Sequence, residues 1–525
     1  MSERVEIYDT TLRDGTQAEG LSPTVGDKLR VAGLLDRLGV DFIEGGWPGA
    51  NPKDDEFFLR AKTELELNTA TLVAFGSTRR PKQGPEQDEG LARLLSADTE
   101  VVCVVGKSWD RHVLHALNTS LEEGVAMVSE SIEYLRSEGR RVFFDAEHLF
   151  DGYRENPEFA LLILAAAAAA GAERVVLCDT NGGTLPPQAT SVVNEVKARI
   201  DTPLGVHFHD DGACAVANSL AAVEAGAFQV QGCMNGYGER TGNADLCSVI
   251  PNLVLKMGRH ALAGSGIDHL HPIAHEIAEV MNAPIEPRRP YVGTSAFAHK
   301  AGLHTSGLAR LEGAYEHIDP GLVGNTAKQL FSELMGRATL LQAAATRGWD
   351  LDQELAQTIV DQVKELEHLG YQFEAADGSF ELLVRRAMGT DGDHFSLKSL
   401  LVTVNADGQR NASATATLRL EIDGEDIELA RSGDGPVHAM DEVLRAALSP
   451  HYPEVESLHL TDYKVRDLDS SDGTAARVRV LIETSEGEST WGTIGVHQNI
   501  IEASWEALSD GIRVGLLRAT ADHSS

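Results

Sequence analysis

Hydrophobic positions in the first 260 residues recur as short apolar runs separated by amphipathic or alanine-rich segments. Most runs are rich in valine, isoleucine and phenylalanine without strict alternation, which is typical of strands buried on both faces. The segments between them, such as VGDKLRVAGLLDRLG, have helical periodicity. The runs predict strands at residues 4–9, 40–46, 71–75, 100–106, 140–147, 173–180, 203–210 and 227–234.

A regular alternation of strand and helix places residues 1–270 in the α/β class. Eight strand–helix units favour a (β/α)8 TIM barrel. An open, doubly wound sheet is the alternative, but such a sheet seldom consists of eight strand–helix units in regular alternation. In a (β/α)8 barrel, catalytic side chains lie at the carboxyl ends of the strands. The polar residues that close the predicted strands are therefore the first candidates for a site.

The strand–helix rhythm is lost after residue 270. Residues 271–394 are predicted to form linker and helical subdomains that complete the active site. From 395 to 525 the order strand, strand, strand, helix occurs twice, and GPVHAMDEVLRAAL resembles IGVHQNIIEASWEAL at the two helix entries. This duplication of roughly 60 residues predicts a separate α+β domain with pseudo-symmetry.

Composition and charge limit the molecules that the protein is expected to bind and the compartment in which it is expected to work. The formal net charge of −35 disfavours binding to nucleic acid or anionic lipid, so an anionic substrate needs a locally positive pocket. No apolar run of about 18 residues predicts a membrane span, and MSERVEIYDT lacks the features of a signal peptide. The five cysteines form no C-x-x-C pair, which favours a reducing cytoplasm over a disulfide framework or a zinc knuckle.

The pair His207 and His209 ends the seventh predicted strand. Side chains at i and i+2 of a strand face the same way, so both imidazoles can bind one metal ion. An isolated H-x-H is a weak signal, but Asp14 and Asn243 at other strand ends add oxygen donors. Such a mixed set suits Mg²⁺, Mn²⁺, Co²⁺ or Zn²⁺. Other polar residues at predicted strand ends are Arg13, Glu44, Glu147, Asp179 and Thr180.

The glycine-rich loop at 232–243 has a competing interpretation as a nucleotide loop. Its spacing is one residue too long for the dinucleotide fingerprint, and no Walker or G-x-S-x-G motif occurs. We interpret it as a tight turn that brings the backbone close to a ligand and directs Asn243 inward. His112 and His148 are interpreted as polar surface residues, and composition alone assigns no role to His299 or His304.

Four motifs together carry a family resemblance. DTTLRDGTQ, CDTNGG, VHFHDD and NGYGERTGN resemble those of the metal-dependent Claisen-condensing barrel enzymes. That family includes 2-isopropylmalate, homocitrate and citramalate synthases, with hydroxymethylglutaryl-CoA lyase as a relative. EGGWPGANPKDDEFF, FGSTRR and FFDAEHLFDGY are similar to the citramalate branch. The duplicated domain resembles the LeuA-type allosteric and dimerisation domain of these synthases, so the resemblance spans essentially the whole chain.

The resemblance implies a role for each matching residue. It implies a divalent metal held by Asp14, His207, His209 and Asn243. It implies substrate contacts from Arg13, Thr180 and Glu44. It implies that Arg13 is a catalytic oxyanion donor and that Glu147 and His304 form the catalytic acid/base pair. Tyr315 would assist this pair. His304 rather than His299 matches the AGxH pattern of the family.

The implied reaction condenses acetyl-CoA with pyruvate and water to give (R)-citramalate and CoA on the route to isoleucine. The resemblance also implies that the chain forms a homodimer and that isoleucine is its feedback inhibitor. The alternative is a 2-isopropylmalate or homocitrate synthase acting on a larger 2-oxo acid, and pocket size separates the two. A non-catalytic regulatory protein on an inactive barrel is the remaining alternative. The intact strand-end residues argue against it.

Overall fold

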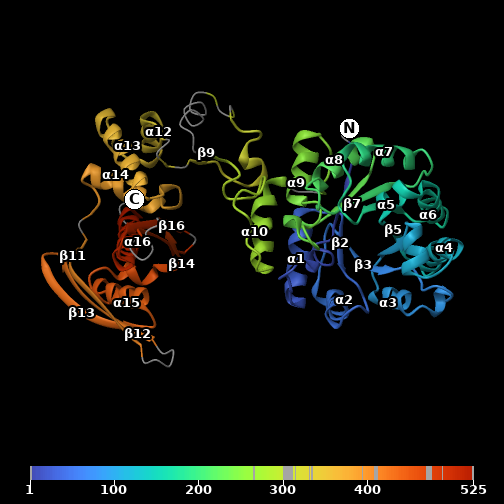
Figure 1. Cartoon of the computed structure of the whole chain (residues 1–525), viewed down its shortest axis with the longest axis horizontal. Coiled ribbons are helices and arrows are strands. Elements are labelled where there is room, and N and C mark those ends of the chain that lie inside the picture. The colour runs from blue at the N-terminus through green and yellow to red at the C-terminus, as the bar shows by residue number, and fades with distance from the viewer. Residues whose placement is uncertain are drawn as a thin grey trace. The chain divides into compact units, whose positions relative to one another are not determined.

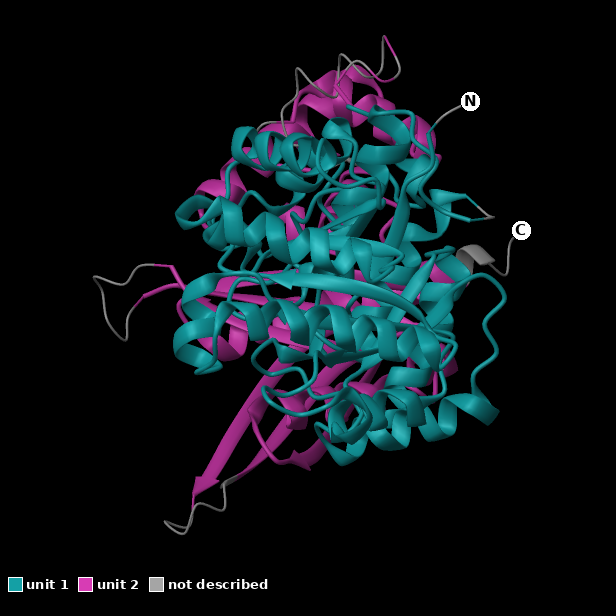
Figure 2. Ribbon diagram, turned by 90° about the vertical axis from the view of Figure 1, so that its right-hand side faces the viewer, with its two compact units in different colours: residues 1–297, 317–327 teal, residues 298–316, 328–525 magenta. Residues whose placement is uncertain are grey.

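The computed structural model divides into two compact units. It describes residues 3–263, 266–299, 311, 313, 315–329, 331–332, 335–392, 394–406, 412–468, 476–487 and 489–522. The first unit comprises residues 1–297 and 317–327, and the second comprises 298–316 and 328–525 (Figure 2). The predicted domain boundaries at 270 and 394 stay predictions. None of the described helices is long and apolar enough to cross a membrane.

The first unit contains a closed barrel of eight parallel strands, which confirms the predicted fold and excludes the open sheet (Figure 1). Each strand pairs with the next, and β8 pairs with β1 to close the ring. The strands are β1 (Glu6–Asp9), β2 (Phe42–Gly46), β3 (Thr71–Ser77), β4 (Val101–Lys107), β5 (Arg141–Glu147), β6 (Arg174–Asp179), β7 (Leu204–Phe208) and β8 (Gln229–Gly232).

Helices cover the outside of the barrel and begin at recognisable caps. Thr24 and Asp27 form a capping box at α1, and Asn51 caps α2 ahead of a proline in its first turn. The helices are α1 (Val25–Leu38), α2 (Pro52–Glu64), α3 (Glu89–Ala97), α4 (Leu121–Ser137), α5 (Leu149–Glu155), α6 (Pro157–Ala169), α7 (Pro186–Lys197), α8 (Ala215–Ala225), α9 (Leu246–Pro251) and α10 (Leu270–Val280).

The barrel interior is layered along its axis. At the amino ends of the strands, Glu6 accepts hydrogen bonds from Arg174 at 2.7 Å and from Gln229 at 3.1 Å. Aromatic rings of Tyr8, Phe42 and Phe143 fill the next layer. Polar side chains return above this aromatic layer. The base of the barrel is therefore closed by packing, and its chemistry is confined to the carboxyl ends of the strands.

A buried ion pair fastens the loop between β2 and α2. The Lys28 side chain is 2% exposed, and its Nζ donates to Asp54 Oδ1 at 2.6 Å. Asp54 also accepts the backbone N–H of Trp47 at 2.9 Å. Burial lowers the pKa of Lys28, since its charge has left water. Asp54 therefore both compensates a buried cation and fixes the loop that carries Trp47.

Asp54→Ala is expected to lower the free energy of unfolding by about 3–5 kcal/mol, because it leaves the Lys28 ammonium buried without its partner. Urea denaturation measures this loss. Glu56→Ala, which removes an exposed i,i+4 pair with Arg60 on the same helix, is the matched control and should cost about 0.5 kcal/mol or less. Equal denaturation midpoints for the two variants would contradict the role given to Asp54.

The second unit joins a small helical cluster to two sheets. Stacked rings of Phe331 and Phe380, 4.0 Å apart, lie in the core of the helical cluster. Ser379 of this cluster donates to Asp510 Oδ2 at 3.2 Å, which ties the cluster to the C-terminal helix. The helices are α12 (Arg337–Arg347), α13 (Gln353–His368) and α14 (Asp377–Met388), and the short parallel strands are β9 (Ala298–His299) and β10 (Lys328–Gln329).

The predicted duplication is present as two three-stranded antiparallel sheets, each followed by a helix. Both first strands carry a register shift at the equivalent point, between Leu397 and Ser399 and between Leu460 and Asp462. Buried apolar residues of both copies belong to one core. The copies are β11 (Ser396–Ala406), β12 (Ala412–Ile422), β13 (Glu425–Gly433) and α15 (Pro436–Leu448), then β14 (His459–Asp467), β15 (Val478–Glu486), β16 (Ser489–His497) and α16 (Ile500–Asp522).

The structure corrects how the two helix entries correspond. The sequence similarity equates Val437 and His438 with Val496 and His497, but the second pair lies in β16, and α16 begins only at Ile500. The equivalent helix starts are Pro436 and Ile500, each three residues after the end of a strand. The repeated valine and histidine therefore belong to a helix start in one copy and to a strand in the other.

Candidate active site

A cavity of about 420 Å³ lies at the carboxyl ends of the barrel strands. Arg13 and Asp14 reach it from the loop after β1, and His207 and His209 reach it from β7 and the residue beyond its end. The structure thus brings together six of the predicted site residues as cavity lining: Arg13, Asp14, Glu147, Thr180, His207 and His209.

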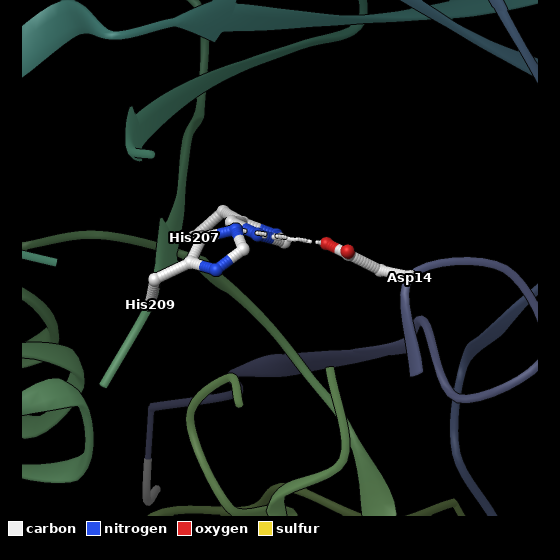
Figure 3. A group of neighbouring side chains, drawn as sticks. All are labelled: Asp14, His207 and His209. Carbon is white, nitrogen blue, oxygen red and sulfur yellow. Dashed lines mark ion pairs between the residues drawn. The ribbon is translucent and has the colours of Figure 1, made fainter. Parts of the chain in front are cut away.

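Asp14, His207 and His209 form a buried cluster whose ligand atoms all lie within 4.8 Å of one another. Asp14 Oδ2 is 3.2 Å from His207 Nε2 and 3.8 Å from His209 Nε2. Both imidazoles point toward the carboxylate (Figure 3). One carboxylate and two imidazoles, each at most 5% exposed, can hold a divalent cation.

The charge states of this cluster suit metal binding. Burial opposes ionisation of Asp14, yet the Arg13 guanidinium and His207 hold the pKa of its carboxyl well below its usual range. Burial and repulsion from His207 lower the pKa of His209 to about 3, so this imidazole is neutral near pH 7. Burial also opposes protonation of His207, but Asp14 raises its pKa. A bound cation would replace the proton of His207 as the partner of Asp14.

Asn243 lies beside His209, to which it is joined by an isolated antiparallel bridge. It is 2% exposed, and its Oδ1 has no hydrogen-bond partner among the described residues. A buried oxygen without a donor fits a nearby cation. Gly242 shapes this turn with φ +95°, and a Cβ there would lie 2.0 Å from the carbonyl oxygen of Gly236. The turn that positions Asn243 therefore requires glycine.

Arg13 is held from three sides. Its Nε donates to Glu44 Oε1 at 2.5 Å, its guanidinium lies 3.8 Å from the ring centre of Phe75, and its Nη1 is 3.6 Å from Asp14 Oδ2. Glu44 is fully buried, and its second oxygen accepts the Tyr8 hydroxyl at 2.6 Å. Glu44 thus positions Arg13, and its predicted contact with substrate stays a prediction.

Glu147 and Thr180 face the cavity from β5 and from the end of β6. Lys107, on the neighbouring strand β4, forms an ion pair with Glu147. Sequence reasoning missed Lys107, although a lysine that ends a buried apolar strand is a usable signal. The Thr180 hydroxyl accepts the backbone N–H of His148 at 2.9 Å, so its own proton can be donated to a ligand.

Two further predicted residues are His304 and Tyr315. His304 lies outside the described residues, and Tyr315 belongs to the second unit, where it is 46% exposed. Their catalytic roles stay predictions. His112 and His148, interpreted as surface residues, are partly buried, and their rings pack edge to face with centres 4.5 Å apart.

Comparison with known proteins covers nearly the whole chain. The family model described as HMGL-like matches residues 4–274. The model described as homocitrate synthase post-HMGL domain-like matches residues 291–370, and the LeuA allosteric (dimerisation) domain matches 374–516. The site cluster lies within the first of these matches.

Curated relatives agree with the family models. The chain is 49% identical to an (R)-citramalate synthase of Aquifex aeolicus, over 99% of each chain. It is 49% identical to an (R)-citramalate synthase of Streptomyces coelicolor, over 99% of this chain and 98% of the relative. A 2-isopropylmalate synthase of Methanocaldococcus jannaschii is 32% identical over 97% of this chain and 94% of its own. The chain therefore belongs to the HMGL-like family and, within it, to the (R)-citramalate synthases.

Proposed function

We propose that the barrel condenses acetyl-CoA with pyruvate and water to give (R)-citramalate and CoA. The observation that carries this proposal is the buried Asp14–His207–His209 cluster, which shares one cavity with Arg13 and Thr180. This arrangement supplies what an α-keto acid requires, namely a cation site for its oxygens and donors for its charge.

A divalent cation (Mg²⁺, Mn²⁺, Co²⁺ or Zn²⁺) held by Asp14, His207 and His209, with Asn243 beside them, would polarise the ketone as a Lewis acid. Arg13 donates to the ketone oxygen as negative charge develops there. Thr180 donates its hydroxyl to the keto-acid carboxylate.

Proton transfer is assigned to Glu147, which would remove a proton from the acetyl methyl group. The resulting enolate attacks the ketone carbon to form the new C–C bond, and water then cleaves the thioester to release CoA. His304 and Tyr315 are proposed to complete the acid/base set. These two assignments rest on the family resemblance alone.

Acetyl-CoA is larger than the cavity that holds the cluster. A second cavity, of about 660 Å³, shares Arg13, Gln17 and Trp47 with the first. It gives the thioester room next to the reaction centre.

The five cysteines, all free, support a reducing compartment such as the cytoplasm.

A keto-acid panel tests the proposed reaction. CoA release from acetyl-CoA should be fastest with pyruvate, and the product should be (R)-citramalate. The alternative function, 2-isopropylmalate or homocitrate synthase, predicts instead that CoA release is faster with 2-oxoisovalerate or 2-oxoglutarate. Absence of CoA release with every keto acid and every candidate metal would favour the non-catalytic alternative.

The C-terminal domain is proposed to dimerise the chain and to bind isoleucine between its two copies. The start of α15 supports an amino-acid carboxylate site, because no side chain in the described part of the chain caps its N–H groups. The start of α16 is a weaker candidate, since Asn499 Oδ1 already accepts the N–H of Ile501 at 2.9 Å. Dimerisation without a ligand is the alternative.

Isoleucine is expected to inhibit the full-length enzyme much more strongly than leucine. Gly435→Asp should weaken this inhibition by at least about tenfold, because an N-cap carboxylate both occupies the N–H groups of α15 and repels the ligand carboxylate. Inhibition kinetics and calorimetry measure the effect. If neither amino acid binds to the wild-type chain, only the dimerisation role is left.

A further inference from the structure

A buried hydrogen-bonded chain runs from His207 across the barrel interior. His207 Nδ1 is 2.9 Å from Oε1 of Gln231 on the adjacent strand β8. The Gln231 amide nitrogen donates to Asp145 Oδ1, on β5, at 3.0 Å. Both Gln231 and Asp145 are at most 3% exposed. Neither residue is among the predicted metal ligands or catalytic groups.

Asp145 fixes the orientation of the Gln231 amide. A carboxyl oxygen accepts hydrogen bonds, so the amide NH₂ group must face Asp145 and the amide oxygen must face His207. The opposite orientation would place two acceptor oxygens 3.0 Å apart. Burial raises the pKa of Asp145, and a protonated carboxyl group still accepts this hydrogen bond on Oδ1 when its proton is on Oδ2.

The amide orientation in turn selects the tautomer of His207. Because Gln231 presents an oxygen, Nδ1 of His207 carries a proton, and the Nε2 of the neutral ring keeps a lone pair. This Nε2 is the atom that faces Asp14. Outer hydrogen bonds of this kind set the ring orientation and basicity of metal-binding histidines.

We propose that Gln231 and Asp145 are positioning residues that hold the His207 imidazole with its Nε2 lone pair directed at the cation site. The proposal rests on the metal site of the proposed function. It also accounts for the second cluster of potential ligand residues among the described part of the chain, Glu44, Cys103 and Asp145. Arg13 and Tyr8 engage the oxygens of Glu44, and Gln231 engages Asp145, so hydrogen bonding explains this cluster.

The strand β8 provides a matched control. Gln229 lies two residues before Gln231 and faces the same interior, but it donates to Glu6 in the layer at the base of the barrel. Gln231→Met and Gln229→Met therefore remove the same chemical group from the same strand. Only the first change touches the partner of His207.

Mn²⁺ affinity of the full-length chain without substrates tests the proposal, measured by calorimetry and electron paramagnetic resonance. Gln231→Met should raise the Kd for Mn²⁺ by about 10- to 100-fold, whereas Gln229→Met should remain close to wild type. Asp14→Ala should abolish the signal and so show that binding occurs at this site. Circular dichroism checks that each variant is folded.

Wild-type affinity in Gln231→Met would overturn the proposal. So would equal losses in Gln231→Met and Gln229→Met, because this result indicates general distortion of the barrel. A chain that binds Mn²⁺ with this pattern, yet makes no citramalate, would refute the proposed reaction and leave the positioning role intact. A wild-type chain that binds no divalent metal would refute the positioning role.

Discussion

Asp14→Ala and His207→Ala are each expected to lower kcat by at least about 10³-fold, which corresponds to about 4 kcal/mol of lost transition-state stabilisation. Both side chains belong to the buried cluster with Oδ2 and Nε2 only 3.2 Å apart. Removing either leaves too few donors to hold a cation against water. The barrel should stay folded, because residues at this end of a TIM barrel serve function more than stability.

Steady-state kinetics with acetyl-CoA and pyruvate measure this loss. Wild-type enzyme treated with a chelator should lose activity and recover it when Mn²⁺ or Mg²⁺ is added, while the two variants should not recover. Thermal unfolding of each variant controls for stability. Full activity of the metal-free wild-type enzyme would remove the metal site from the mechanism.

Arg13→Lys should reduce kcat by roughly 10²-fold or more, although it preserves the charge. The guanidinium meets Glu44, Asp14 and the face of Phe75 at the same time, and a single ammonium cannot reproduce this planar arrangement. The effect should fall on kcat more than on the KM for pyruvate, because the donated hydrogen bond strengthens as charge develops.

Initial-rate measurements over a range of pyruvate concentrations separate the two parameters. Arg37→Lys, at an exposed pair with Glu276, is the control and should leave both unchanged. If Arg13→Lys turns over at a rate close to wild type, Arg13 is not an oxyanion donor. If only KM rises, Arg13 binds the ground state of the substrate instead.

The sequence predicts the cavity lining well because strand periodicity is local. Alternation along one strand places His207 and His209 on one face, and barrel topology brings the end of every strand to the same edge. Asp14, Glu147 and Thr180 could therefore be assigned to one site without knowledge of a single distance. The closed barrel and the membership in the citramalate synthases are both confirmed.

Contacts between side chains of different strands could not be predicted in this way. The contacts of Arg13 with Glu44, of Lys107 with Glu147 and of Gln231 with Asp145 depend on which layers meet once the barrel has closed. Which layers meet is determined by the stagger of all eight strands together, and no local sequence pattern indicates this stagger. The helix entries of the duplicated domain were misaligned for a related reason, since similar letters occupy a strand in one copy and a helix in the other.

The common core of the two βββα copies has a consequence for how the C-terminal domain unfolds. Apolar side chains from α15 and α16 are buried in one cluster, so the two copies share part of their core. We therefore expect the two copies to unfold together in one cooperative transition. A displacement of side chains in one copy should also shift the packing of the other, because close-packed interiors transmit strain.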